Sequence, residues 1–259
     1  MRIKALMAAP LLALILTAAP ARAEPAEAAL RLYAAGDFLA AADLADDRET
    51  AASLSFASRA LMAQCATAPS RSDLDTWLAR AERAARDALE LDPQSVDARL
   101  QLALVYGARG RRASLTQAFA GRYAPRGRAL IDEALALEPR NARAHALLGA
   151  WNLEVLRRGG RFGAVTYGAS YRAGAAEFER AMALAPDDPT IPLHYAFALL
   201  ELNAAQNADR AAALLRRAAG LRPRDALERF VTRTAQRIAR TLEEDGPGAA
   251  QRAARATFL

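Results

Sequence analysis

Apolar residues recur every three or four positions along almost the whole chain after residue 24, and polar residues fill the positions between them. This spacing places the apolar positions on one face of a helix, whereas a strand would show strict alternation. Alanine and leucine, which dominate the apolar set, are also strong helix formers. The pattern therefore predicts an all-α protein.

One sequence phrase returns four times, over residues 81–93, 127–139, 174–186 and 211–223. Each copy has a small residue, a second core residue four positions later, an alanine three further on and a proline after five more. The four sets are Ala81/Ala85/Ala88/Pro93, Gly127/Ile131/Ala134/Pro139, Gly174/Phe178/Ala181/Pro186 and Ala211/Leu215/Ala218/Pro223. Small residues let helices approach closely, and proline ends the helix. These are the second helices of tetratricopeptide repeats, so the expected fold is all-α, a right-handed helical solenoid of tetratricopeptide-type helix hairpins.

Two of the predicted hairpins are longer than a standard repeat. The four prolines lie 46, 47 and 37 residues apart, against a standard period of 34. The extra residues fall between the two helices of a hairpin, at 111–126 and 158–172. Both inserts are rich in arginine and glycine and contain aromatic residues. We therefore expect a solenoid with two lengthened hairpins, and long loops in a compact repeat array are usually functional or mobile.

Two phrases beyond the generic repeat, LLGAW at 147–151 and FGAVTYGAS at 162–170, resemble the tetratricopeptide domain of the regulator-of-microtubule-dynamics family. In that family an LGxW phrase and a glycine-containing insert precede a second helix that ends in a Leu-x-Pro turn. The matching residues here are Leu148, Gly149, Trp151, Gly168, Leu184 and Pro186. The resemblance covers about residues 75–225 and implies the same architecture. Ala150 replaces a usually basic residue, and an exported chain would meet no microtubules, so the activity in the family's name is not expected here.

The N-terminal residues have the features of a secretory signal peptide. Two basic residues precede an uncharged apolar run over residues 5–19, and the small residues Ala21 and Ala23 stand before Glu24. The run is shorter than the roughly 20 residues that span a bilayer. We predict cleavage at Ala23/Glu24 and a periplasmic or secreted protein with no transmembrane segment left after cleavage. The alternative is an uncleaved N-terminal anchor.

The domain organisation follows from these boundaries. We expect the signal peptide at 1–23, a helical repeat domain at 24–242 and a flexible C-terminal tail at 243–259, set off by Gly246-Pro247-Gly248. The last helix of the domain, 225–242, is predicted to cap the array, because a terminal repeat needs a cover with a polar outer side. A membrane-surface helix is the alternative for this segment.

Charge and cysteine content exclude some functions. Without Arg2, Lys4 and Arg22, 32 basic residues remain against 29 acidic ones, an excess too small to favour nucleic acid as a partner. Cys65 is the single cysteine, so an intramolecular disulfide is impossible. Its apolar sequence neighbours predict a buried thiol rather than a reactive one.

No arrangement of residues predicts catalysis. His145 and His194 lie on successive first helices without a carboxylate or cysteine at metal-ligand spacing. The paired acids Glu177/Glu179 and Asp187/Asp188 are expected on the surface or at helix ends. We therefore expect a non-enzymatic protein with no cofactor and no metal.

The concave face of such a solenoid is lined by the second, fifth, ninth and twelfth residues of each first helix. Counting from Val96, Ala142 and Pro189 gives Asp97, Leu100, Leu104, Gly107, Arg143, Ala146, Ala150, Leu153, Thr190, Leu193, Phe197 and Leu200. This predicts a groove with an apolar middle and with Asp97 and Arg143 near one edge. The alternative is a tightly wound array in which these residues bury one another.

An apolar groove is compatible with two functions. The first is an exported scaffold that binds a protein or peptide of the cell envelope. The second is a soluble periplasmic carrier of a lipid or another apolar small molecule, with the arginine-rich inserts meeting an anionic head group. A shallow groove would favour the scaffold, and a continuous apolar lining would favour the carrier.

Overall fold

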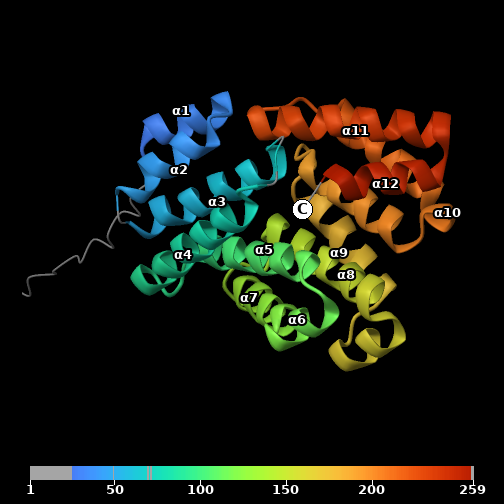
Figure 1. Ribbon diagram of the computed structural model, residues 1–259, viewed down its shortest axis with the longest axis horizontal. Helices are drawn as coiled ribbons and strands as arrows, with labels where there is room; N and C mark the ends of the chain where they lie inside the picture. Colours follow the sequence, from blue (N-terminus) through green and yellow to red (C-terminus); the bar gives the residue numbers. More distant parts are fainter. Residues whose placement is uncertain (1–24, 49, 69, 71, 258–259) are drawn as a thin grey trace, which may run out of the picture.

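The computed structural model describes residues 25–48, 50–68, 70 and 72–257 (Figure 1). The regular structure of these residues is helical, which confirms the all-α prediction. The helices are α1 (Glu27–Ala35), α2 (Phe38–Asp46), α3 (Ala51–Thr67), α4 (Leu74–Leu91), α5 (Val96–Arg112), α6 (Leu115–Ala120), α7 (Tyr123–Leu137), α8 (Ala142–Tyr167), α9 (Tyr171–Leu184), α10 (Thr190–Gly220), α11 (Ala226–Asp245) and α12 (Pro247–Thr257). The predicted signal peptide, 1–23, lies outside the described residues.

The repeated phrase lies on the second helix of successive hairpins, α3–α4, α5–α7 and α8–α9, and on the second half of α10. The alanine that follows the core residue is fully buried in every copy: Ala88, Ala134, Ala181 and Ala218. A buried alanine leaves room for a neighbouring helix to pack closely. The repeated sequence phrase therefore places its alanine at a helix–helix contact in every copy.

A single residue separates the two helices of the fourth hairpin. Within α10, Asn203 has extended backbone angles, φ −162° and ψ 96°. Its side-chain Oδ1 accepts a hydrogen bond from the Gln206 backbone N–H at 3.1 Å, which caps the second half of α10. The Asn203 side chain therefore caps the start of a new helix at the residue where the first helix is interrupted.

Both inserts are largely helical rather than looped. The first contains α6, whose N-terminus has a capping box formed by Ser114 and Gln117. The second is a break in α8 at Gly160, where φ is 53°, followed by a helical segment up to Tyr167. Such a positive φ is accessible to glycine at little cost. The extra residues thus lie where the proline spacing predicted them, but they form helical segments instead of long loops.

The C-terminal segment differs from the expected flexible tail. Residues 247–257 form α12, in which Ala250 and Ala254 are fully buried. The Gln251 side chain donates to the Leu200 carbonyl at 2.8 Å. Gly246, at φ 81°, provides the turn, and Pro247 is the first residue of the new helix, where it loses no hydrogen bond. The glycine–proline pair is therefore a helix–helix turn.

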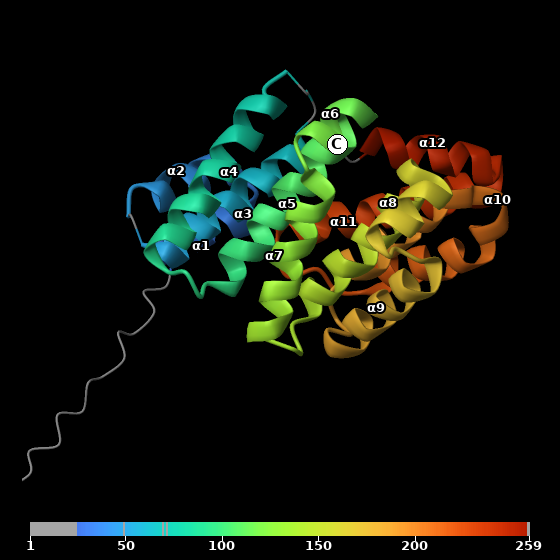
Figure 2. The same ribbon diagram turned by 90° about the horizontal axis from the view of Figure 1, so that it is seen from below.

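The two ends of the array meet. The first turn of α11 brings Ala226 and Leu227 against the N-terminal core around Tyr33, and Arg229 Nη2 donates to the Ala34 carbonyl at 2.9 Å. In Figure 1, α11 starts beside α1 and runs along the top of the molecule towards α10. Figure 2 shows the same array of hairpins from below. The helix predicted as a cap also joins the two ends of the solenoid.

Candidate functional site

The structure buries the large apolar side chains of the predicted groove. Leu100, Leu153, Leu193, Leu200 and Phe197 are all at most 6% exposed, and the last four belong to one core cluster. They lie on the first helices as expected, but neighbouring helices cover them. The expectation of an apolar middle open to a ligand therefore does not match the packing. These residues act as core.

The solvent-accessible part of the same face has one leucine among small and polar residues. Leu104, Ala146, Ala150 and Thr190 are partly exposed, and Gly107 and Arg143 are exposed. Asp97 keeps 37% of its side-chain surface. The first helices therefore offer a partner a mixed surface with two charged side chains, not a continuous apolar one.

Asp97 is the centre of a cluster that joins three helices. Arg59 Nη2 lies 2.8 Å from both carboxylate oxygens of Asp97, and Arg143 Nη1 lies 2.7 Å from Oδ1. The three side chains come from α3, α5 and α8. We call Arg59, Asp97 and Arg143 the inner arginine cluster. The helical count predicted Asp97 and Arg143 but not Arg59, because α3 carries no recognisable repeat phrase.

Acidic charge beyond Asp97 also acts on the inner arginine cluster, because Asp188 influences Arg143. Partial burial by itself would raise the pKa of Asp97, but the charges of Arg59 and then Arg143 hold that pKa below its usual range. The surrounding protein and the charge of Arg59 lower the pKa of Arg143, although a guanidinium stays charged at neutral pH. Two guanidiniums therefore share one carboxylate.

The cluster also has an unused donor. Arg59 Nε is buried and has no hydrogen-bond partner among the described residues. Buried polar groups are normally satisfied, so each exception calls for an explanation. Because Nε is buried, a ligand from outside the chain cannot reach it, and the accessible donors of the cluster are on the Arg143 guanidinium.

Tyr33 and His194 have shifted pKa values, and different charged groups act on the two side chains. Burial raises the pKa of Tyr33 above its usual range, with charges on Asp225, Arg59 and Arg143 acting on it as well. His194 keeps solvent contact, but the protein around it lowers the pKa of its imidazole to about 4, opposed by Asp188. The arginines of the inner arginine cluster therefore influence Tyr33 on α1, whereas Asp188 and Arg111 influence His194.

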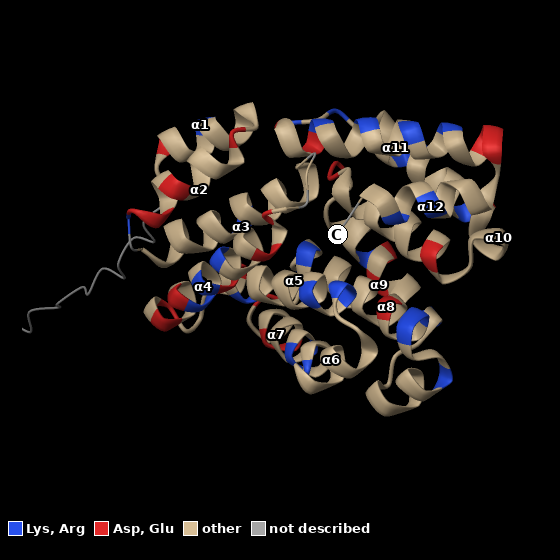
Figure 3. Cartoon of the chain, in the orientation of Figure 1, with Lys and Arg blue, Asp and Glu red and all other residues tan. Residues whose placement is uncertain are grey.

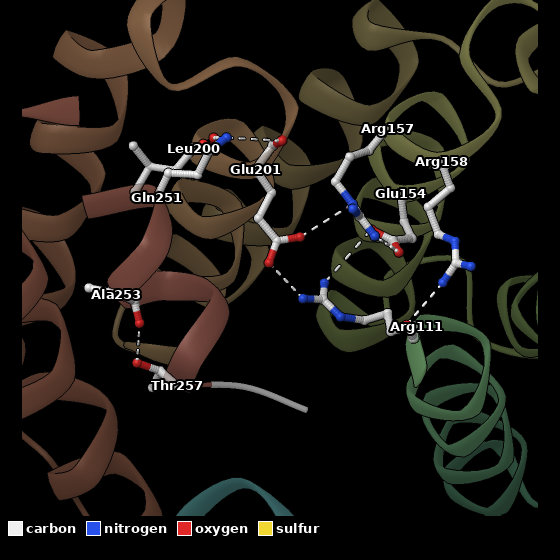
Figure 4. Close-up of polar contacts among 9 residues, drawn as sticks. All are labelled: Arg111, Glu154, Arg157, Arg158, Leu200, Glu201, Gln251, Ala253 and Thr257. Atoms are coloured by element: carbon white, nitrogen blue, oxygen red, sulfur yellow. Dashed lines mark hydrogen bonds and ion pairs between the residues drawn. The ribbon is translucent and has the colours of Figure 1, made fainter. Parts of the chain in front are cut away.

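A second charged cluster joins α5, α8 and α10 (Figure 4). The carboxylate of Glu201, which is buried, lies 2.7 Å from Arg111 Nη2 and 3.3 Å from Arg157 Nε. Glu154 pairs with Arg157 at 2.6 Å. All four charges are compensated within the cluster, so it has no capacity left for a ligand. Its contacts hold three hairpins together.

The histidine and cysteine considered as reactive groups, His145 and Cys65, are buried in the fold. His145 is buried, with Nδ1 2.5 Å from a Glu177 carboxylate oxygen and Nε2 3.0 Å from the Pro139 carbonyl. Cys65 is buried, which raises the pKa of its thiol to about 12 and makes it unreactive. Across the described residues, no group of three or more histidine, cysteine or acidic side chains could hold a metal ion. No described helix is both long and apolar enough to cross a bilayer.

The family described as Regulator of microtubule dynamics protein 1-3 matches residues 28–243 of the chain. The chain belongs to this family. The match extends beyond the 75–225 region in which the resemblance was visible, and it includes the N-terminal hairpin and α11. No curated protein matches the chain.

Among solved structures, the chain is similar to the crystal structure of a thermophilic TPR protein from Thermus thermophilus. The two are 20% identical, the match covers 81% of this chain and 95% of that chain, and the TM-score is 0.56. At this identity the similarity concerns the fold. It confirms a helical solenoid of tetratricopeptide type.

Proposed function

We propose that this protein is an exported, non-enzymatic scaffold whose inner face binds an acidic peptide segment of a cell-envelope protein. The observation that carries the proposal is the inner arginine cluster, in which two arginines share the single carboxylate of Asp97. An added carboxylate would accept hydrogen bonds from the Arg143 donors that Asp97 does not use. Hydrogen bonds between charged partners are stronger than neutral ones and can fix the orientation of a bound chain.

Arg143 is the main contact expected for that carboxylate. Its side chain is 44% exposed, and one Nη is used by Asp97, which leaves further donors on the guanidinium. The partly exposed Ala146 and Ala150, one and two turns along α8 from Arg143, leave space for the backbone of a bound segment.

The packing favours a peptide over a lipid. An acyl chain needs a continuous apolar lining. The large apolar residues of this face are instead buried in the core: Leu153, Leu193, Leu200 and Phe197. A carrier would have to expose these residues first. The scaffold needs no such rearrangement, so it is the better supported of the two functions.

Selection from a random peptide library on the purified protein tests the binding site. We expect the selected peptides to be enriched in aspartate and glutamate. Arg143→Gln should weaken them by about 10- to 100-fold, since hydrogen bonds to charged groups contribute about 1.5–3 kcal/mol. The matched control is Arg180→Gln, an exposed arginine on α9 outside the cluster. Peptides without acidic enrichment, or equal affinities for both variants, would contradict the proposal.

Export has a separate test, because it rests on residues 1–23 alone. N-terminal sequencing of the protein recovered from the periplasm should begin at Glu24. Recovery of chains that begin at Met1 from the cytoplasm would contradict export without affecting the peptide site.

A further inference from the structure

Large apolar side chains are exposed on both inserts. Leu115 and Phe119 on α6 are 62% and 71% exposed, and Phe162 and Val165 near the end of α8 are 78% and 86% exposed. No residue of α6 is buried. Apolar groups that protrude in this way gain nothing from the fold of the chain itself, and clustered exposure of this kind marks an interaction site.

The second insert turns its apolar side chains outwards. After the break at Gly160, Gly163 lies so close to Val155 that an added Cβ would come within 3.0 Å of the Val155 carbonyl oxygen. Tyr167 packs edge-on against Trp151. With one side of this short helical segment held against α8, Phe162 and Val165, three positions apart, share the opposite side.

The bases of the two inserts are joined. The Arg158 guanidinium donates to three carbonyls at the end of α5: Gly110 at 2.5 Å, Arg111 at 3.0 Å and Ala113 at 2.8 Å. Figure 4 shows Arg158 beside this helix end. In Figure 1 both inserts project from the lower edge of the molecule. The two inserts are therefore anchored to each other at their bases, and together we call them the insert face.

The charge of the insert face has one sign. Residues 111–126 and 158–172 contain seven arginines and no acidic residue. Two of these arginines, Arg111 and Arg112, pair with Glu201 and Asp75 outside the inserts. Arg122, Arg161 and Arg172 are exposed and form no ion pair with any described residue. In Figure 3 the end of the second insert, at the lower right, shows basic residues and no acidic ones. Apolar side chains thus protrude among arginines whose charge is uncompensated.

We propose that the insert face docks the protein on a membrane surface that contains anionic phospholipid. The apolar side chains stand on two separate protrusions, so a protein partner would need two matching recesses, whereas a bilayer interface accepts each side chain independently. Guanidinium groups bind phosphate in two-pronged geometry, and the negative surface potential of anionic lipids attracts basic residues. This docking is independent of the peptide site on the inner face.

Co-sedimentation of the full chain with phosphatidylcholine vesicles, with or without phosphatidylglycerol, tests the docking. Each variant carries the same residues 5–19, so differences between variants report the insert face. We expect Arg122→Gln/Arg161→Gln/Arg172→Gln to lose about five-fold in partitioning per arginine on the anionic vesicles. Phe119→Ser/Phe162→Ser should lose at least about ten-fold. These positions are exposed, so thermal melting should stay unchanged.

Control variants place an equal charge change and a smaller apolar change elsewhere on the surface. Arg83→Gln/Arg180→Gln/Arg222→Gln removes three exposed arginines from α4, α9 and the segment before α11, and Leu91→Ser removes an exposed leucine from α4. Both should partition like the parent chain. If the control variants lose as much vesicle partitioning as the insert variants, membrane binding depends on net charge or general hydrophobicity, and the proposal is overturned.

A local probe decides whether the insert itself enters the bilayer. In Phe162→Trp, brominated lipids in anionic vesicles should quench the added tryptophan fluorescence above the background of Trp77 and Trp151. Absence of additional quenching would overturn the proposal, as would capture of a protein partner that contacts Phe162 and competes with vesicles for it. Acidic peptides selected on the inner face should bind the Phe119→Ser/Phe162→Ser variant unchanged, so failure of one proposal leaves the other standing.

Discussion

The hairpins α5–α7 and α8–α9 carry the same repeated phrase but pack at different distances. A Cβ added at Gly127 of α7 would come no closer than 3.9 Å to a neighbouring atom. A Cβ added at Gly174 of α9 would lie 2.9 Å from Leu153 Cγ, and one at Gly149 on α8 would lie 2.7 Å from the Phe178 ring. The small residue is therefore sterically required in the second hairpin and only tolerated in the first.

The core residue of the phrase is also more closely packed in the second hairpin than in the first. Phe178 of α9 is fully buried and stacks on Tyr195, with ring centroids 4.6 Å apart and planes 9° from parallel. It belongs to the large cluster that α9 shares with α10, α11 and α12. Ile131 of α7 belongs to a small cluster with Ala103 and Leu148. A shared register thus sets which residues face each other, while their sizes set how closely the helices approach.

The largest expected difference between the hairpins is at this core residue. Phe178→Ala should lower the free energy of unfolding by about 3–5 kcal/mol, because it removes a stacked ring from the large cluster. Ile131→Ala should cost about 2–3 kcal/mol, near the lower end for such a truncation. Urea denaturation of both variants measures the difference. An equal or larger loss for Ile131→Ala would contradict the comparison.

Overpacking at the buried alanines should come next. Ala134 and Ala181 are both fully buried, so Ala134→Leu and Ala181→Leu should each destabilise by about 1–3 kcal/mol. We expect the larger value for Ala181→Leu, since α9 is the more closely packed helix. Thermal melting is sufficient to rank the two. Unchanged melting of both would mean that the repeat register does not describe the packing.

Alanine substitution of the two glycines should change the free energy of unfolding in opposite directions. Gly174→Ala should destabilise by about 1–3 kcal/mol, because the added methyl group meets Leu153 and Asn152. Gly127→Ala should stabilise by about 0.5–1 kcal/mol, because alanine favours the helix and only ordinary contacts are made. Chemical denaturation of each variant gives the sign directly. The same sign for both would remove the distinction between the hairpins.

The smallest expected effect concerns the side chain that links the hairpins. Trp151 Nε1 on α8 donates to the Ala124 carbonyl, in the first insert, at 2.8 Å. Trp151→Phe keeps an aromatic ring and removes this hydrogen bond, so we expect a loss of about 0.5–1.5 kcal/mol. Hydrogen exchange should show faster opening of the first turn of α7 than in the parent chain. Unchanged exchange there would show that the bond does not hold α7 to α8.

The sequence by itself determined the helices, the hairpin register and the position of both inserts. These features depend on local chemistry: the three-to-four spacing of apolar residues, the buried alanines of the phrase, and the prolines that end the helices. The resemblance carried by Leu148, Gly149 and Trp151 also led to the correct family. At the candidate site, Asp97 and Arg143 were predictable because their helical positions could be counted from the start of α5 and α8.

Only the tertiary structure decided which of those positions meet solvent. Helical periodicity assigns a residue to a face, but how tightly the array winds determines whether that face is open, and this depends on the sum of all helix contacts. Leu193 and Phe197 were counted correctly onto the first helix and are nevertheless buried. Arg59 reaches Asp97 from a helix without the repeat phrase, and α11 meets α1 across 195 positions of the chain. Contacts of such separation leave no local pattern, because they form only after every intervening hairpin has packed.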